Sequence, residues 1–150
     1  MNLRTFLAYA VKLELDAESV YRQSAAAMDA LKNRDAAAFF REMAGYCHLH
    51  YEEAMRRAGF NDLSDLPELS YPWPDALGPE SLRPIPAGTI LDLEGATGQA
   101  LAAERCGVAF YEHLARTADD PDVRSLAEEI AAEERGHVLA LERFMGWKPW

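Results

Sequence analysis

Apolar residues recur every three to four positions along four long stretches of the chain, with polar residues between them. The stretches cover about residues 3–31, 34–58, 89–118 and 121–145. Such spacing brings the apolar side chains onto one face of an α-helix. The pattern therefore predicts an all-α protein built from four helices.

Helix-end signals support these boundaries. Asn33 or Asp35 can cap the start of the second helix, and Gly59 lies where a glycine after the last helical turn is expected. Asp120 followed by Pro121 combines a capping aspartate with proline at the first helical position. The second and fourth helices are thus bounded by residues that suit helix ends.

A proline-rich segment, about residues 61–88, separates the first two helices from the last two. It holds six of the eight prolines in the chain, and a helix cannot pass through such a stretch. It is too long for a tight turn, but about 28 extended residues can run along a helix of roughly 37 Å. We therefore predict a single domain, residues 1–150, of two helical hairpins joined by a long crossover, which is the connectivity of a ferritin-like bundle.

Ionisable residues interrupt the apolar faces of these helices. Glu14 lies within the apolar stripe of the first helix, and Cys47 and His50 lie on the inner face of the second. The inner faces predicted for the third and fourth helices are Leu93, Thr97, Leu101, Glu104, Val108, Tyr111 and Leu114, and Val123, Leu126, Ile130, Glu134, His137, Leu141 and Phe144. Carboxylates are costly in a protein core, so a bound cation would explain them.

A glutamate followed seven residues later by a tyrosine occurs once in each half of the chain. The first pair is Glu14 and Tyr21, and the second is Glu104 and Tyr111, at an offset of 90 residues. We expect both tyrosines to pack in the core with their hydroxyls bonded to carboxylates. A catalytic role in electron relay is the alternative for Tyr21 and Tyr111.

A second motif also occurs almost twice. Glu134-Arg-Gly-His137 in the last helix corresponds to Cys47-His-Leu-His50 in the second helix, at an offset of 87 residues. Residues three apart share a helix face, so Glu134 and His137 can present an oxygen and a nitrogen to one ion. One glutamate plus one Glu-x-x-His, given twice, is the ligand set of di-iron carboxylate bundles. Here Cys47 replaces one glutamate of that set.

Carboxylate and imidazole ligands together suit iron, manganese or zinc. The six candidate metal ligands are Glu14, Cys47, His50, Glu104, Glu134 and His137. Glu133 could replace Glu134 beside His137, but the apolar stripe through Ile130 and Leu141 favours Glu134. We expect Cys106 to face away from the site and His48 and His113 to lie at the surface.

The chain resembles the rubrerythrin-like branch of the ferritin-like superfamily over nearly its whole length. The resemblance rests on residues 14–21, 40–50, 104–111 and 126–137. It implies that Glu14, His50, Glu104, Glu134 and His137 bind two irons. It also implies peroxide reduction, oxygen chemistry or iron oxidation as the activity of an oxidoreductase.

Two departures from that family leave alternatives open. Cys47 removes a bridging carboxylate, and it could ligate metal as a thiolate, act as a redox-active thiol or fill space as a small buried residue. Cys47, His50, His137 and a glutamate could form a closed zinc site in a non-catalytic protein. A single-metal site, or a structural bundle with a vestigial site, is the further alternative. The chain has two cysteines and lacks a four-cysteine iron site, so an external electron donor is expected.

The composition limits the classes of partner that we expect the protein to bind. The formal net charge of −10 argues against nucleic acid, because phosphate binding needs clustered lysine and arginine. The N-terminus lacks the features of a signal peptide, and no apolar run approaches the length of a membrane span. We therefore expect a cytoplasmic protein that binds metal ions and peroxide or O₂, and that forms a homodimer.

Overall fold

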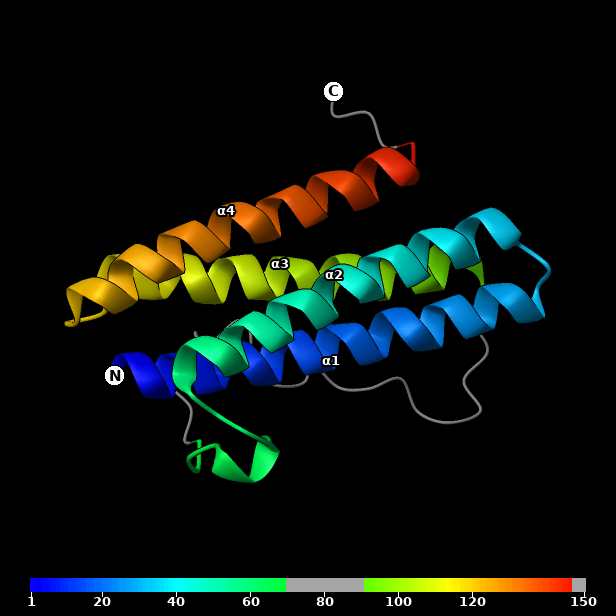
Figure 1. Ribbon diagram of the computed structural model, residues 1–150. Helices are drawn as coiled ribbons and strands as arrows, with labels where there is room; N and C mark the ends of the chain where they lie inside the picture. Colours follow the sequence, from blue (N-terminus) through cyan, green and yellow to red (C-terminus); the bar gives the residue numbers. More distant parts are fainter. Residues whose placement is uncertain (70–90, 147–150) are drawn as a thin grey trace.

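The computed structural model describes residues 1–69 and 91–146, which form four long helices (Figure 1). The long helices are α1 (Leu3–Ala30), α2 (Arg34–Ala58), α3 (Leu93–Thr117) and α4 (Pro121–Phe144), and a short 3₁₀ turn, η1, spans Leu63–Asp65. The described residues contain no strand. The all-α prediction is confirmed, and most of the predicted crossover lies outside the described residues.

Capping contacts fix the helix ends. Asn33, rather than Asp35, caps α2 through its side chain, which accepts from the backbone N–H of Ala36. Gly59 ends α2 in the left-handed conformation with φ of 73°, and Asp120 caps α4 immediately before Pro121. Local chemistry thus determines both ends of α2 and the start of α4.

The third helix begins later than the sequence pattern predicts. Asp92 caps α3 by accepting from the N–H of Gly95, so the helix starts at Leu93. The predicted start near residue 89 lies outside the described residues. A competent N-cap inside the predicted helix is the physical reason for the difference, because the capping residue itself is not helical.

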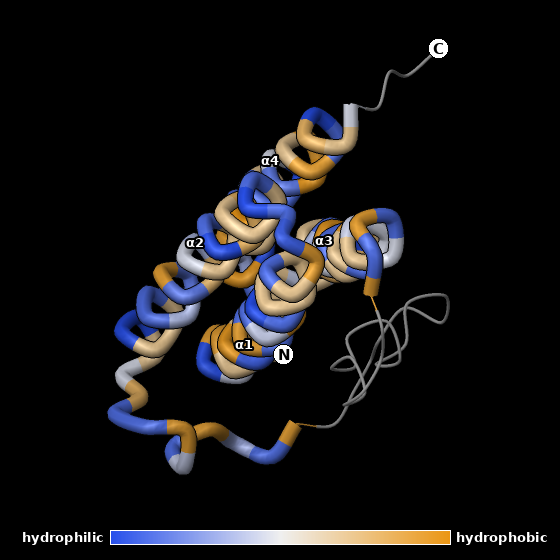
Figure 2. Tube along the Cα trace, turned by 90° about the vertical axis from the view of Figure 1, so that its right-hand side faces the viewer, coloured by the Kyte–Doolittle hydropathy of each residue, from blue (hydrophilic) through white to orange (hydrophobic). Residues whose placement is uncertain are grey.

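Each hairpin packs closely within itself, α1 against α2 and α3 against α4. The two hairpins meet mainly where α1 packs against α3. Figure 2 looks nearly along the helices, shows all four around a common interior, and marks hydrophobic residues in orange. Among the described residues, no helix is both long enough and apolar enough to cross a membrane.

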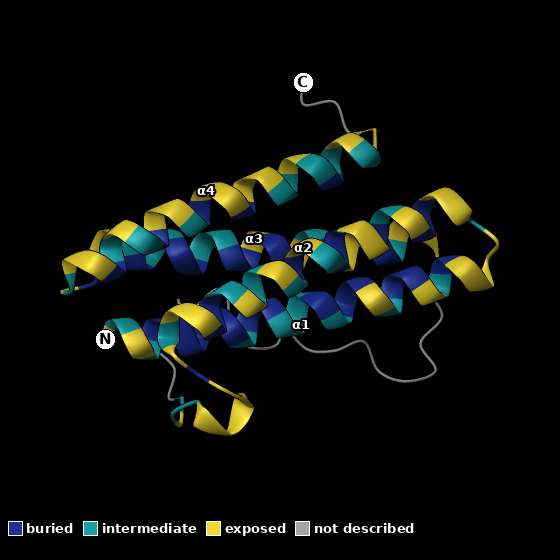
Figure 3. Cartoon of the chain, viewed as in Figure 1, coloured by how far each residue is buried: buried dark blue, intermediate teal, exposed yellow. Residues whose placement is uncertain are grey.

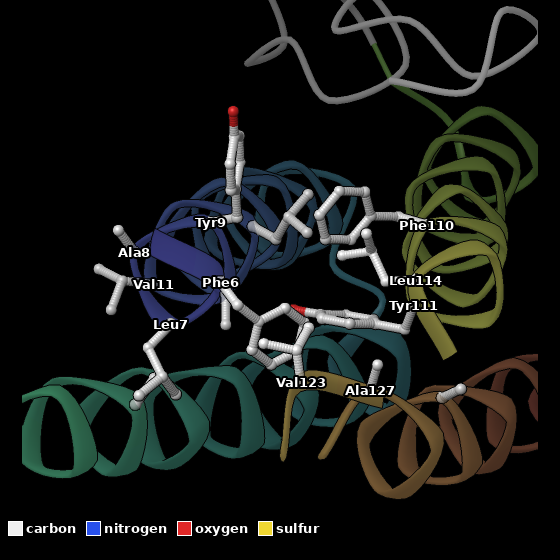
Figure 4. Close-up of a cluster of buried hydrophobic side chains, with 14 of the residues drawn as sticks. Phe6, Leu7, Ala8, Tyr9, Val11, Phe110, Tyr111, Leu114, Val123 and Ala127 are labelled. Carbon is white, nitrogen blue, oxygen red and sulfur yellow. The ribbon is translucent and has the colours of Figure 1, made fainter. Parts of the chain in front are cut away.

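The core consists of two apolar clusters. The first contains aromatic residues of α1 and α3 together with α4 residues such as Val123 and Ala127 (Figure 4). The second lies toward the other end of the helices and includes Tyr21, Phe40 and Leu141. Along α1, α2 and α4, the candidate ligands fall between the stretches that supply the two clusters. The polar residues therefore form a band between two apolar layers.

Small residues, rather than the predicted large ones, form much of the buried face of α3. Ala96, Ala100 and Ala103 are buried, whereas Leu93 is exposed and Leu101 is half-buried. Figure 3 colours each helix by burial and shows buried and exposed residues alternating along it. The predicted inner face of α3 is wrong at these large residues, because small residues supply much of the face that α3 buries in the bundle. The same holds in α4, where Ala127 and Ala131 are buried and Leu126 and Ile130 are half-buried.

Candidate metal centre

All four long helices contribute to one cluster of carboxylate and imidazole groups. Glu14 comes from α1, His50 from α2, Glu104 from α3, and Glu134 and His137 from α4. They form two groups, one of Glu14, His50 and Glu134 and the other of Glu104, Glu134 and His137. Within each group the potential ligand atoms all lie within 4.8 Å of one another. Glu134 belongs to both groups and so connects them.

The three carboxylates lie in the protein interior. Glu14, Glu104 and Glu134 are only 5%, 2% and 6% exposed. His50 and His137 are half-buried at the side of the cluster where α2 faces α4. Their imidazole rings stack with centroids 5.4 Å apart and planes 12° from parallel. Buried carboxylates without a compensating cation are costly, and the ion-pair partners of these three among the described residues are His50 and His137.

The contact distances suit ligands of a shared ion. Nδ1 of His50 lies 3.5 Å from Oε1 of Glu14, and Nδ1 of His137 lies 3.4 Å from Oε2 of Glu104. Both Nδ1 atoms are buried and lack a hydrogen-bond partner among the described residues. Ligands held at 2.0–2.2 Å from one metal ion stand roughly 3–3.5 Å apart. The residues present therefore fit a metal ion in each group.

Comparison with known proteins supports the same fold. No protein-family model and no curated protein match the sequence. The crystal structure of an uncharacterized conserved protein from Magnetospirillum magnetotacticum MS-1 superimposes with a TM-score of 0.78 at 31% identity. The match covers 100% of this chain and 97% of that chain. The chain belongs to the same ferritin-like family.

In this ferritin-like protein, the two site tyrosines differ. The hydroxyl of Tyr21 donates to Oε1 of Glu104 at 2.6 Å, as the sequence predicts. Tyr111 is also buried, but its hydroxyl has no hydrogen-bond partner among the described residues. Tyr21 therefore orients the carboxylate of the candidate ligand Glu104, whereas Tyr111 does not bond to a carboxylate among the described residues.

Cys47 belongs to neither group of mutually close ligand atoms. Its side chain is 1% exposed and packs in the second apolar cluster. Burial raises the pKa of the Cys47 thiol, and the nearby charges of Glu14, Glu104 and Glu134 raise it further. In the metal-free protein Cys47 is thus a neutral thiol that fills space.

Glu104 and Glu134 share their environment but titrate in opposite directions. Burial and then the charge of Glu104 raise the pKa of Glu134 well above its usual value. Burial also acts to raise the pKa of Glu104, but the contacts with His137, Glu134 and Tyr21 together lower it. Burial and the neighbouring carboxylate thus favour the neutral form of Glu134, whereas the contacts of Glu104 favour its ionised form.

The predicted choice between the adjacent glutamates of α4 agrees with the geometry. Glu134 is buried and belongs to both ligand groups, whereas Glu133 is exposed. Glu133 does reach the site from outside, since its Oε2 lies 3.6 Å from Nε2 of His50.

Cys106 is buried in the first apolar cluster and belongs to neither ligand group. His113 is half-buried.

A polar network next to the site was not predicted from the sequence. Glu18 is buried one helical turn after Glu14 and accepts two hydrogen bonds from Arg22. Nδ1 of His48 lies 3.1 Å from Glu18, and Nε2 of His48 lies 2.7 Å from Glu52. The four-residue spacing from Glu14 to Glu18 was the available signal, because it places both side chains on one face of α1.

A pocket of about 90 Å³ connects the site with solvent between α1, α2 and α4. The candidate ligands Glu14 and His50 line it, and so do Glu129 and Glu133 of α4. Arg57 also lines the pocket and pairs with Glu53 at 2.7 Å. Four of the nine lining residues are glutamates, so the pocket gives a cation a path with acidic side chains to Glu14 and His50.

Proposed function

We propose that this ferritin-like protein is a rubrerythrin-like, non-haem iron protein. In this proposal Glu14, His50, Glu104, Glu134 and His137 bind two metal ions. The reaction is reduction of peroxide or oxygen, or oxidation of iron itself. The observation that carries the proposal is the place of Glu134 in both ligand groups.

The chain's residues would have distinct roles. Bound iron supplies redox electrons, and its charge compensates the buried carboxylates. His50 and His137 supply nitrogen ligands through Nδ1, and Tyr21 holds one oxygen of Glu104 in place. The apolar clusters lie on either side of the band of ligands, and solvent reaches it through the pocket between α1, α2 and α4. Electrons would come from an external donor.

A site with one metal ion is the second candidate. It is favoured by the position of Cys47, which leaves Glu134 as the one carboxylate common to both groups. With a single shared carboxylate, two ions would repel each other more than in a site with two bridging carboxylates. Zinc remains an alternative identity, although the predicted set that includes Cys47 is not among the ligand groups of the described residues.

Metal content decides between these candidates. Metal-free protein is loaded anaerobically with Fe(II), freed of unbound metal and measured by elemental analysis. We expect two irons per chain in the wild type and a loss of both in Glu134→Ala, because both groups lose a ligand. Glu133→Ala is the matched control, since Glu133 is adjacent but exposed, and it should retain two irons.

The other outcomes are equally informative. One iron per chain in the wild type would support the single-metal alternative, and zinc retained in the presence of excess Fe(II) would support a zinc protein. A wild type that binds no metal would leave a structural bundle with a vestigial site. Identical iron content in Glu134→Ala and wild type would contradict the proposed ligand set.

Activity is tested separately on the iron-loaded protein. Hydrogen peroxide added without oxygen should oxidise bound Fe(II) in the wild type, with two iron electrons reducing each peroxide to water. The proposed oxidoreductase activity is wrong if Glu134→Ala oxidises the same amount of iron at the same rate.

The proposed homodimer is tested by light scattering, where the mass of a single chain would contradict it.

A further inference from the structure

A small cavity lies beside the shared carboxylate, between α1, α3 and α4. Its volume is about 10 Å³, and its lining includes Glu14, Glu104 and Glu134 together with Gly107 and Tyr111. A volume near this size holds about one water molecule, provided that two to four polar groups are available as partners. The cavity is therefore polar enough and just large enough for one oxygen atom of a small molecule.

Gly107 keeps this cavity open. It is buried in the interior of α3, where glycine is less favourable than alanine. Its φ is not in the left-handed region, so backbone conformation does not require glycine. A Cβ at residue 107 would lie 3.3 Å from Oε2 of Glu134 and 3.8 Å from its Cδ. A methyl group would thus occupy space next to the shared carboxylate and push against it.

Tyr111 lies one helical turn after Gly107 on the same face of α3. Its side chain is 1% exposed, and its hydroxyl has no hydrogen-bond partner among the described residues. In Figure 4 the Tyr111 ring extends from α3 toward α1, with its oxygen at the end nearer α1. Buried hydroxyls are nearly always hydrogen-bonded to protein or to ordered water. Because Tyr111 also lines the cavity, its unpartnered hydroxyl is available for a hydrogen bond to a small molecule held there.

We propose that Gly107 and Tyr111 form a binding site for one small oxygen ligand beside Glu134. The ligand is water in the metal-free protein and one end of hydrogen peroxide in the iron-loaded protein. Gly107 provides the space, and the Tyr111 hydroxyl donates a hydrogen bond to the ligand. The peroxide part rests on the proposed function, whereas the water part does not.

Crystal structures of the metal-free protein test the site without reference to any reaction. In the wild type we expect an ordered water within hydrogen-bond distance of the Tyr111 hydroxyl. In Gly107→Ala this water should be absent, while the helices remain superimposable. A wild-type cavity without ordered water, with the Tyr111 hydroxyl bonded to a protein group instead, would overturn the proposal.

Peroxide kinetics test the iron-loaded protein. We expect Gly107→Ala and Tyr111→Phe to slow peroxide-dependent oxidation of bound Fe(II) by about tenfold or more, because the peroxide is displaced or misoriented. Both variants should retain the iron content of the wild type. Gly98→Ala is the matched control, since Gly98 is exposed on the same helix and a Cβ there would meet nothing within 4 Å. It should react at the wild-type rate.

The outcomes separate this site from the proposed function. Unchanged rates in both Gly107→Ala and Tyr111→Phe would overturn the peroxide part of the proposal. If Gly107→Ala also loses iron through displacement of Glu134, Tyr111→Phe decides, because it removes only the unpartnered hydroxyl. A wild type that binds no iron would overturn the proposed function, while water at Tyr111 would still support the cavity site.

Discussion

Tyr21 is a core residue whose hydroxyl bonds directly to a candidate metal ligand, Glu104. Tyr21→Phe removes a buried hydroxyl that donates at 2.6 Å to a carboxylate. Because one donor to buried Glu104 is lost, we expect the free energy of unfolding of the metal-free protein to fall by about 1–3 kcal/mol. Urea denaturation measures this change.

Tyr46→Phe provides the matched control for Tyr21→Phe. Tyr46 also donates to a glutamate, Glu42, at 2.8 Å, but it is 43% exposed. Water replaces a lost surface hydrogen bond, so the free energy of unfolding should change by less than about 0.5 kcal/mol. Equal changes in the free energy of unfolding would mean that the buried bond of Tyr21 contributes no more to stability than the exposed bond of Tyr46.

Cys47 offers a test of the missing carboxylate. Cys47→Glu restores the Glu-x-x-His pattern with His50 but adds a fourth acidic side chain near Glu14, Glu104 and Glu134. The metal-free variant should be less stable than the wild type, because carboxylates repel and burial is costly. Added Fe(II) should raise its melting temperature more than it raises that of the wild type.

Cys47→Gln separates charge from size in this experiment. Glutamine adds nearly the same volume as glutamate but no charge, so it should show the crowding effect without the larger response to Fe(II). If the glutamate and glutamine variants respond equally to Fe(II), the restored carboxylate does not bind metal. The measurement is a thermal melt with and without anaerobic Fe(II).

Helix periodicity predicted which of the candidate metal ligands lie in the interior, such as Glu14 and Glu134. The choice of Glu134 over Glu133 followed from one apolar stripe. Periodicity could not distinguish the hydroxyl of Tyr21 from that of Tyr111, although both follow a glutamate by seven residues. That difference depends on contacts between helices, since Tyr21 of α1 reaches Glu104 of α3.

At the scale of a helix, the two glycines of α2 have opposite expected effects. Gly59 has a φ of 73° at the end of the helix, where a side chain is strained. Gly59→Ala should therefore lower the free energy of unfolding by about 1 kcal/mol. Gly45 lies inside the helix, and a Cβ at this position would meet nothing within 4 Å. Gly45→Ala should raise the free energy of unfolding by about 0.5–1 kcal/mol.

Thermal denaturation of the two variants checks this pair. The melting temperature should fall for Gly59→Ala and rise for Gly45→Ala. A rise for both would mean that the left-handed end of α2 does not matter for stability. The wild type measured in the same buffer provides the reference.

Element boundaries were predictable where a cap coincided with the end of an apolar stripe. Gly59, Asp120 and Pro121 satisfy this condition, and the helix ends agree. The start of α3 was not predictable from its stripe, because Leu91 is itself buried just before the Asp92 cap. The alanine-rich contact of α3 was also missed, since close packing of two helices favours small residues that a search for large apolar side chains overlooks.

The whole molecule places three buried carboxylates between two apolar clusters, and this determines how pH acts on the metal-free protein. The pKa of Glu134 is raised, so its contribution to stability is present below the unfolded value of about 4.3 and is lost as pH rises through the folded value. The pKa of His50 is also raised, chiefly by Glu14 against the effect of burial. Its contribution is present below about 6.5 and is lost as pH rises through its folded value.

The contribution of Glu104 to stability changes with pH in the opposite direction, and it does so in a lower pH range. Its pKa is lowered, so its contribution is present above about 4.3 and is lost only as pH falls through the folded value below that. At neutral pH and above, the raised pKa values of Glu134 and His50 therefore act in the same direction, and so does that of His48 beside Glu18. The free energy of unfolding of the metal-free protein should be larger at pH 6 than at pH 8.

Bound metal should reverse this pH dependence, because a cation competes with the protons on Glu134 and His50. The rise in melting temperature caused by a fixed Fe(II) concentration should thus be larger at pH 8 than at pH 6 under anaerobic conditions. Glu134→Gln removes the carboxyl with the raised pKa, so the metal-free variant should lose part of the slope and respond little to Fe(II). A metal-free wild type that is more stable at pH 8 would contradict the raised pKa values of Glu134 and His50. Melts of both proteins at the two pH values, with and without Fe(II), therefore test whether proton and metal compete for the carboxylate that joins the two ligand groups.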